Sequence, residues 1–246
     1  MTRLALISDI HGNLVALDAV LAAIQARGDA QIVCLGDVAA TGPQPHEVAR
    51  RLRELGCPVV MGNTDAWLLK PAPRETPDGA PSLIDTIDLW CAEQLTPDDR
   101  AFLASFAPSV AVELDGGKRL LCYHGSPRSF FDRISPDTPN DQLAELLAET
   151  DADLYAGGHT HVQMLRRHLK SILINPGSVG LPVNPTWPGP DMRNPAWAEY
   201  ALIECDGERL SVALQRVPFD TAALVRIARS CGMPHADVWS ADWDGV

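Results

Sequence analysis

The sequence predicts an α/β fold in which two β-sheets stack face to face and helices cover their outer faces. In the first half of the chain, short apolar runs alternate with amphipathic segments of helical length, which is typical of β-α-β units and a largely parallel sheet. In the second half, short apolar runs separated by turn residues indicate further strands. The chain has 246 residues, of which 46% are hydrophobic, so it can bury a sizeable core, and we expect residues 1–246 to form a single domain.

Apolar strands alternate with amphipathic helices in the first half of the chain. The expected strands lie at 3–8, 31–35 and 58–61, and the expected helices at 14–24 and 45–55. Gly28 and Gly56 follow the two helices, and glycine is the residue that most often ends a helix. This part therefore predicts three strands joined by two helices.

The middle of the chain predicts a helical insertion at about residues 71–108. A proline-rich, polar stretch at 70–81 is expected to be an irregular loop. Two helices follow at 83–94 and 98–106, and Thr96 is a favourable N-cap for the second.

The remaining residues predict mainly strands. A hairpin is indicated at 110–114 and 120–123, followed by a helix at about 140–149. Further short strands are expected at 153–156, 164–166, 171–174, 200–204 and 210–216. We interpret 182–195 as a surface loop and about 218–246 as a C-terminal helix and tail.

The composition excludes several classes of protein. The net charge of −12 argues against stable binding of nucleic acid or of an anionic membrane, but a bound cation can reverse the local charge and attract a phosphorylated substrate. No apolar run approaches the roughly 20 residues of a membrane span, and the first residues do not resemble a signal peptide. We interpret the six scattered cysteines as buried free thiols, which predicts a cytoplasmic protein. The oligomeric state stays open, including a homo-oligomer.

Five short segments place metal-binding side chains at the carboxyl end of a predicted strand or in the turn after it. They are Ser8-Asp9-Ile10-His11-Gly12-Asn13, Gly36-Asp37, Gly62-Asn63-Thr64-Asp65, His124-Gly125 and Gly157-Gly158-His159-Thr160-His161. In open α/β sheets, ligand sites assemble at the carboxyl ends of the strands. We therefore expect these segments to meet in one site.

The segments offer two aspartates, four histidines and one asparagine as metal ligands. Asp9 and His11 are two positions apart, as are His159 and His161, so each pair can reach one ion. Mixed oxygen and nitrogen donors suit manganese, iron, zinc, nickel or cobalt better than calcium or magnesium. Seven side chains exceed one tetrahedral site and fit two ions that share a carboxylate. With a bridging hydroxide, formal charges leave such a centre at about +1, which attracts a phosphate ester.

The five segments, in this order, resemble the calcineurin-like metallophosphoesterase superfamily. Its pattern D-x-H, G-D, G-N-x-D, H-G and G-H-x-H is matched at every step, over about residues 3–217. The short opening segment, the Gly-Asn-Thr-Asp block and residues 175–180 resemble the small bacterial and archaeal phosphodiesterase branch. The resemblance implies a four-layer α/β/β/α sandwich of two mixed sheets flanked by helices.

The resemblance also implies a role for each matched residue. Asp9, His11 and His161 would bind the first metal ion, Asp37 would bridge both ions, and the second ion would be bound by Asn63, His124 and His159. The ions would be divalent, with manganese expected and iron, zinc, nickel or magnesium as alternatives. A hydroxide bridging the ions would be the nucleophile, with no covalent enzyme intermediate.

The sequence departs from the family at Thr64. Many relatives have histidine directly after the asparagine, where it helps to protonate the leaving group, and threonine cannot act as an acid near neutral pH. Protonation would then fall to water, to Asp65 as a catalytic residue, or to no group. Asp65 has an alternative interpretation as an acidic residue favoured at a helix N-terminus.

The candidate substrate-binding residues surround the predicted metal ligands. They are Asn13, Thr64, Ser126 and Arg128. Arg128 would bind a phosphate through two hydrogen bonds or be an ordinary surface cation. Asn13 would orient the substrate or only shape its turn.

The function expected from these patterns is hydrolysis of a small phosphorylated substrate, most readily a phosphodiester. The alternatives within this class are a phosphomonoesterase and a pyrophosphatase acting on dinucleoside polyphosphates. A non-catalytic protein-binding scaffold on the same fold is an alternative of another class. A scaffold has no need of all seven ligands, and all seven are present.

Overall fold

The computed structural model describes residues 1–72, 82–183 and 193–243. Most of the loop expected at 70–81, most of the loop expected at 182–195 and the last three residues of the C-terminal tail lie outside the described residues. The described residues form two mixed sheets.

The first sheet has the strand order β2-β1-β8-β9. These strands are β1 (Thr2–Ile7), β2 (Gln31–Cys34), β8 (Trp197–Asp206) and β9 (Arg209–Pro218). The pair β1 and β2 is parallel, as expected from the helix between them, whereas β8 is antiparallel to both β1 and β9. A strand from the end of the chain therefore lies beside the first strand.

The second sheet has the strand order β3-β4-β5-β7-β6. Its strands are β3 (Val110–Leu114), β4 (Lys118–Cys122), β5 (Leu154–Ala156), β6 (Met164–His168) and β7 (Ser171–Asn175). The three central strands are parallel, and the hairpin partner at each edge is antiparallel. Parallel central strands bring their carboxyl ends to one edge of the sheet, where the sequence places candidate ligands.

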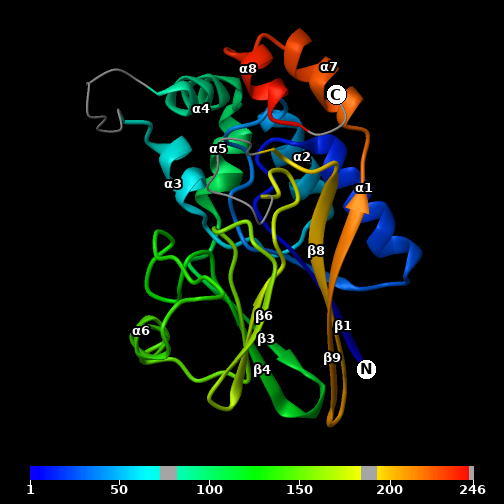
Figure 1. The fold of residues 1–246 in the computed structure, drawn as a ribbon, viewed down its shortest axis with the longest axis vertical. Coiled ribbons are helices and arrows are strands. Elements are labelled where there is room, and N and C mark those ends of the chain that lie inside the picture. Colours follow the sequence, from blue (N-terminus) through cyan, green and yellow to red (C-terminus); the bar gives the residue numbers. More distant parts are fainter. Residues whose placement is uncertain (73–81, 184–192, 244–246) are drawn as a thin grey trace.

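Alternating side chains of the strands build the four layers. Leu4 and Leu6 of β1 face the core between the two sheets, while Ala5 and Ile7 face the helical side. Helix α1 (Leu14–Ala26) covers that outer face, and α6 (Asn140–Leu146) packs on the outer face of the second sheet. The two helices lie on opposite sides of the strands in Figure 1, which confirms the predicted α/β/β/α sandwich.

The prediction of a strand at 58–61 is wrong, because this segment changes its pairing partner within two residues. Val60 donates to Cys34 of β2, but Met61 donates to Ala107, so the structure forms only isolated bridges. The segment still connects α2 (Pro45–Leu55) to α3 (Asn63–Leu69) and carries the chain to the candidate ligand Asn63.

Helices that do not belong to the sandwich gather at the upper end of the molecule in Figure 1. The expected insertion helices are α4 (Leu83–Gln94) and α5 (Pro97–Ala104), and Thr96 caps α5 as predicted. The C-terminal segment forms two helices, α7 (Thr221–Ser230) and α8 (Ala236–Ala241), where we expected one helix and a tail. The carboxyl end of β1 points toward the same end, so these helices surround the strand ends.

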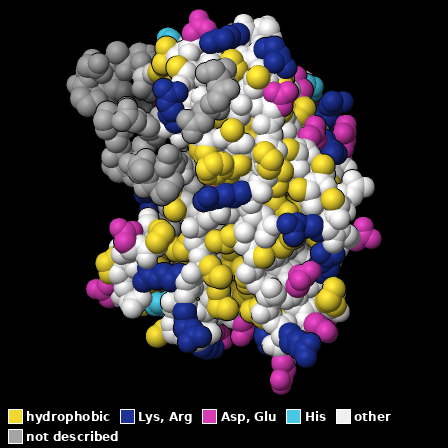
Figure 2. Space-filling model, turned by 45° about the vertical axis from the view of Figure 1, so that its right-hand side comes forward, with side chains coloured by type: hydrophobic (Ala, Val, Ile, Leu, Met, Phe, Trp, Pro, Cys, Tyr) yellow, Lys and Arg dark blue, Asp and Glu magenta, His cyan; other side chains and the backbone are white. Residues whose placement is uncertain are grey.

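Surface charge and cysteines agree with the sequence in most respects. Acidic and basic side chains are interspersed on the face shown in Figure 2, around a band of hydrophobic side chains. All six cysteines are free, and four of them are buried as expected, but Cys57 is only half-buried and Cys231 is exposed. None of the described helices is both long enough and apolar enough to cross a bilayer.

Candidate metal centre

The turns after the strands hold their candidate ligands in an unusual backbone conformation. Five of these residues have a positive φ, between 48° and 66°, a region that side chains disfavour: Asp9, His11, Asp37, His159 and His161. Such strain persists only where the surrounding structure enforces it, and it is typical of functional sites.

One group of ligands joins the turn after β1 to the turn after β5. The Nε2 atom of His161 lies 3.3 Å from Oδ1 of Asp9 and 3.2 Å from Nε2 of His11. The Nε2 atom of His11 lies 4.0 Å from the same Asp9 oxygen. Asp9 and His11 are buried, while His161 is partly exposed, so solvent reaches the group from one side.

A second group contains Asp37, His124 and His159, whose ligand atoms lie within 4.8 Å of one another. Asn63 joins this group, because its Oδ1 atom lies 3.0 Å from Nε2 of His124. Oδ2 of Asp37 lies 3.4 Å from Nε2 of His124 and 3.8 Å from Nε2 of His11. Asp37 thus lies between the two groups, where a shared ligand is expected.

Backbone carbonyl groups fix the orientation of three of the histidine rings. The Nδ1 atoms of His11, His124 and His161 lie 3.1, 2.7 and 2.7 Å from the carbonyl oxygens of Ala40, Leu35 and Leu181. Because a carbonyl only accepts hydrogen bonds, each Nδ1 must donate, which leaves Nε2 of the neutral ring free to bind a metal ion. This arrangement is common among metal-binding histidines.

The buried carboxylates make both groups favourable for cations. Burial opposes a charge on His124, but Asp37 and Asp9 outweigh it and raise the pKa of this histidine to about 10. In the first group, burial also opposes a charge on His161, and Asp9 still raises its pKa. Against the effect of burial, His124 lowers the pKa of Asp37. Each group therefore attracts positive charge, which protons or metal ions can supply.

The donor atoms of the first group are arranged to bind a cation, because they leave a buried carboxylate oxygen without a hydrogen bond. Oδ1 of Asp9 is buried and has no hydrogen-bond partner among the described residues, although it faces two histidine nitrogens. Its other oxygen accepts hydrogen bonds from Ser8 Oγ and from the backbone of His159. An unpaired buried carboxylate oxygen is costly, and a cation held between Asp9, His11 and His161 would remove that cost.

Asp65 occupies a different place from the one expected of a catalytic acid. Its Oδ2 accepts hydrogen bonds from the backbone N–H groups of Asp37 and Gly62 at 2.8 and 3.1 Å. Its Oδ1 accepts a hydrogen bond from the backbone N–H of Val38 at 2.8 Å. Burial and the charge of Asp37 raise its pKa to about 7, while the backbone donors oppose this shift. Both oxygens are committed to the backbone, so the geometry favours a residue that positions Asp37 over a proton donor.

Three of the expected substrate-binding side chains are engaged elsewhere. Asn13 is buried, caps α1 through Ala16 and donates to the carbonyl of Gly180, so it shapes its turn. Ser126 and Arg128 both donate to Asp132, at 2.6 and 2.9 Å. Sequence reasoning missed these partners because an irregular loop separates Asp132 from the His124 motif.

A different cation, Arg133, acts on the second group through its charge. The positive charge of Arg133 contributes, after burial and His124, to a His159 pKa lowered to about 4. Arg133 is exposed, and unlike Arg128 it has no carboxylate partner among the described residues. No sequence signal marks it, because it follows Asp132 in the same irregular loop.

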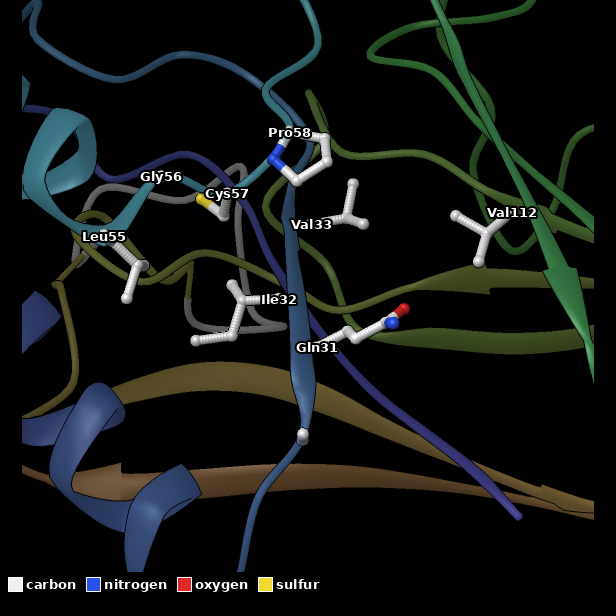
Figure 3. A pocket seen from close by; sticks show the side chains of 9 residues that line it. Gln31, Ile32, Val33, Leu55, Gly56, Cys57, Pro58 and Val112 are labelled. Carbon is white, nitrogen blue, oxygen red and sulfur yellow. The ribbon is translucent and has the colours of Figure 1, made fainter.

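A hollow of about 450 Å³ lies elsewhere, beside the outer edge of β2. Its lining includes Ile32, Val33, Leu55, Pro58 and Val112 and is mostly apolar. Figure 3 shows Ile32 and Val33 on β2, with Val112 on β3 opposite them. None of the candidate ligands lines this hollow, so it is separate from the metal centre.

Comparison with known families and structures agrees with the geometry of the site. The family model of the calcineurin-like phosphoesterase superfamily domain matches residues 2–208. An uncharacterised protein of Methanocaldococcus jannaschii is 32% identical over 198 residues, which cover 74% of this chain and 77% of the relative.

Two solved structures match nearly the whole chain. A metallophosphoesterase from Sphaerobacter thermophilus is 27% identical with a TM-score of 0.74, and the match covers 98% of each chain. A hypothetical protein from Pyrococcus horikoshii is 20% identical with a TM-score of 0.78, covering 96% of this chain and 95% of the other. The second likeness shows the shared fold alone.

The positioning role of Asp65 predicts the effect of Asp65→Asn. The amide cannot accept hydrogen bonds at both of its ends, so at least one buried backbone N–H loses its partner. We expect a loss of about 2 kcal/mol in the free energy of unfolding, measured by urea denaturation with a chelator present. Exposed Asp141→Asn serves as the control. Unchanged stability together with lost activity would show instead that Asp65 takes part in the chemistry.

Proposed function

Because the chain belongs to the calcineurin-like phosphoesterase superfamily and is a metal-dependent phosphoester hydrolase, we propose that it is a phosphodiesterase with a dinuclear metal centre. One observation carries this proposal: Asp37 lies between two groups that each contain two histidines. Two separate groups of donors can bind two ions, and a carboxylate between them can serve both.

The residues of the first group would hold one ion through Asp9, His11 and His161, and those of the second group another through Asn63, His124 and His159. Bound there, the ions would supply an activated water as nucleophile and would neutralise charge on the phosphoryl oxygens. Asp37 would keep the two ions at a fixed separation. The nitrogen and oxygen donors support manganese, with iron, zinc, nickel or magnesium as alternatives.

The charged groups around the centre support a phosphodiester over a more highly charged substrate. Arg128 is already paired with Asp132, whereas the charge of Arg133 acts on His159 and makes this arginine a candidate cation beside the ions. A diester carries one negative charge at the phosphoryl group, whereas monoesters and polyphosphates carry more. We propose that Arg133 contacts a phosphoryl oxygen from the side of His159.

Thr64 has a position that limits the chemistry. Its backbone N–H donates to Oδ1 of Asp37 at 2.9 Å, and its buried hydroxyl makes no hydrogen bond within the described part of the chain. Neither Thr64 nor Asp65, whose oxygens bind the backbone, is poised to protonate a leaving group. We propose that water protonates it, so substrates with good leaving groups react fastest.

The wider surroundings of the site suggest where the protein works. The net charge of −12 disfavours stable binding of nucleic acid and favours small phosphorylated substrates. Free cysteines, including buried Cys34, Cys91 and Cys122, support a reducing compartment, and we propose the cytoplasm.

Asp37→Ala tests the shared ligand. We expect activity to be lost and both metal ions to be depleted, because each group loses a carboxylate at once. Metal content is measured by mass spectrometry after purification, with exposed Asp137→Ala as the control. Full metal occupancy with retained activity in Asp37→Ala would contradict the bridging role.

Arg133→Ala tests the substrate contact. We expect kcat/KM for an aryl phosphodiester to fall about tenfold, as for the loss of one charge-assisted hydrogen bond, with metal content unchanged. Exposed Arg167→Ala is the control for a lost surface charge. A larger loss in Arg128→Ala than in Arg133→Ala would assign the contact to the other arginine.

The lack of a placed acid predicts a strong dependence on the leaving group. We expect turnover of an aryl phosphodiester to exceed that of the matching alkyl diester by at least about 100-fold, the usual contribution of general acid catalysis. The measurement is kcat for both esters under identical metal loading. Equal rates would mean that the protein supplies a proton donor after all.

A further inference from the structure

The loop of residues 38–42 forms a wall behind the first metal-binding group. The carbonyl oxygen of Ala40 holds Nδ1 of His11 at 3.1 Å. The backbone of Gly12 donates to the carbonyl of Val38 at 2.9 Å. A side chain on Gly42 would collide with the carbonyl oxygen of His11, so the two backbones touch directly. Any shift of this loop therefore moves His11.

The conformation of the loop is not stable by itself. It lies between β2 and α2 and belongs to neither a helix nor a strand. Thr41 has a φ of 68°, which is strongly disfavoured for a β-branched residue. Contacts from elsewhere must therefore stabilise the loop in this shape.

Two helices outside the two sheets provide these contacts. From α4, Asp88 accepts the hydroxyl of Thr41 at 2.7 Å, and Cys91 donates to the carbonyl of Gly42 at 3.4 Å. From α8, Nε1 of Trp239 donates to the carbonyl of Thr41 at 3.0 Å. Asp88 and Trp239 are buried, so these bonds are shielded from water.

Aromatic packing anchors Trp239 in turn. The ring centroids of Trp239 and Trp243 are 5.6 Å apart, and those of Trp243 and Phe219 are also 5.6 Å apart. The match to the family model ends at residue 208, so this aromatic cluster lies beyond the matched domain. The C-terminal segment thus reaches back to a loop that holds a candidate ligand.

We propose that Trp239 and Asp88 are positioning residues that tune metal binding by the Asp9-His11-His161 group through the 38–42 loop. The inference rests on the proposed metal centre and deepens it. Residues that orient a metal-binding histidine commonly contribute 10- to 100-fold to affinity. Trp239 bonds to Thr41 and not to the carbonyl group that orients His11. Because it acts on His11 only through the loop, we expect its removal to weaken metal binding by about tenfold, the lower end of this range. The group around Asp37, His124 and His159 has other supports and would keep its affinity.

Trp239→Phe tests the proposal, because it removes the indole N–H and keeps an aromatic ring. Calorimetric titration of the chelator-treated protein with Mn²⁺ should resolve two binding events, one of them about tenfold weaker in the variant. Trp243→Phe is a matched control: its Nε1 is buried in the same cluster but makes no hydrogen bond within the described residues. We expect this control to bind both ions as the unaltered protein does.

The His11→Ala background identifies which event is affected. His11→Ala should lose the event that Trp239→Phe weakens, and adding Trp239→Phe should leave the remaining event unchanged. Weakening of that remaining event, or equal affinities in Trp239→Phe and Trp243→Phe, would overturn the proposal. Failure of the unaltered protein to bind two ions would refute the dinuclear centre itself.

Thr41→Val provides a second test should Trp239→Phe fold poorly. It keeps the branched shape of the side chain and replaces the hydroxyl that bonds to Asp88 by a methyl group. We expect the same event to weaken, with a circular dichroism spectrum like that of the unaltered protein. Unchanged Mn²⁺ affinity in a folded Thr41→Val would remove the role of α4.

Discussion

The concentration of buried negative charge at the ends of β1 and β2 is the constraint on which the rest of the site depends. Asp9 and Asp37 follow β1 and β2, and Asp65, in the first turn of α3, accepts a hydrogen bond from the backbone of Asp37; all three are buried. Burying a carboxylate is costly unless hydrogen bonds or cations compensate it. Asp65 is compensated by three backbone N–H groups, whereas Asp9 and Asp37 face histidines. The difference separates the carboxylate that builds the site from the two that can bind ions.

The fold satisfies this constraint with short turns. Each candidate histidine with a fixed ring donates its Nδ1 proton to a carbonyl of another segment, so the segments position one another. Close approach also restricts the glycines: a side chain on Gly62 would collide with the carboxylate of Asp37. Disfavoured backbone angles at Asp9, His11 and Asp37 are a cost of folding that metal binding can offset.

The grouping of the candidate ligands could be predicted from the sequence because each follows an apolar segment within a few residues. The order of the strands could not be predicted, since β1 pairs with β8 almost 200 residues away. The side-chain partners were also out of reach. Nothing near Ser126 and Arg128 shows that Asp132 binds both, and nothing near Asp65 shows that its oxygens accept backbone N–H groups. The pairing switch that interrupts 58–61 depends on Ala107, which is equally remote.

Charge also explains why a centre of this kind would select small substrates. The acidic surface as a whole repels polyanions. Arg128, the first cation in the sequence after His124, has its charge compensated by Asp132. With ions bound at the proposed centre, attraction for phosphate would come mainly from those ions and from Arg133, within a Debye length of about 8 Å at physiological salt. A small phosphoester can approach under that limited field, whereas a long polyanion would place most of its charges against an acidic surface. Local positive charge on an acidic protein thus favours substrates that are small as well as phosphorylated.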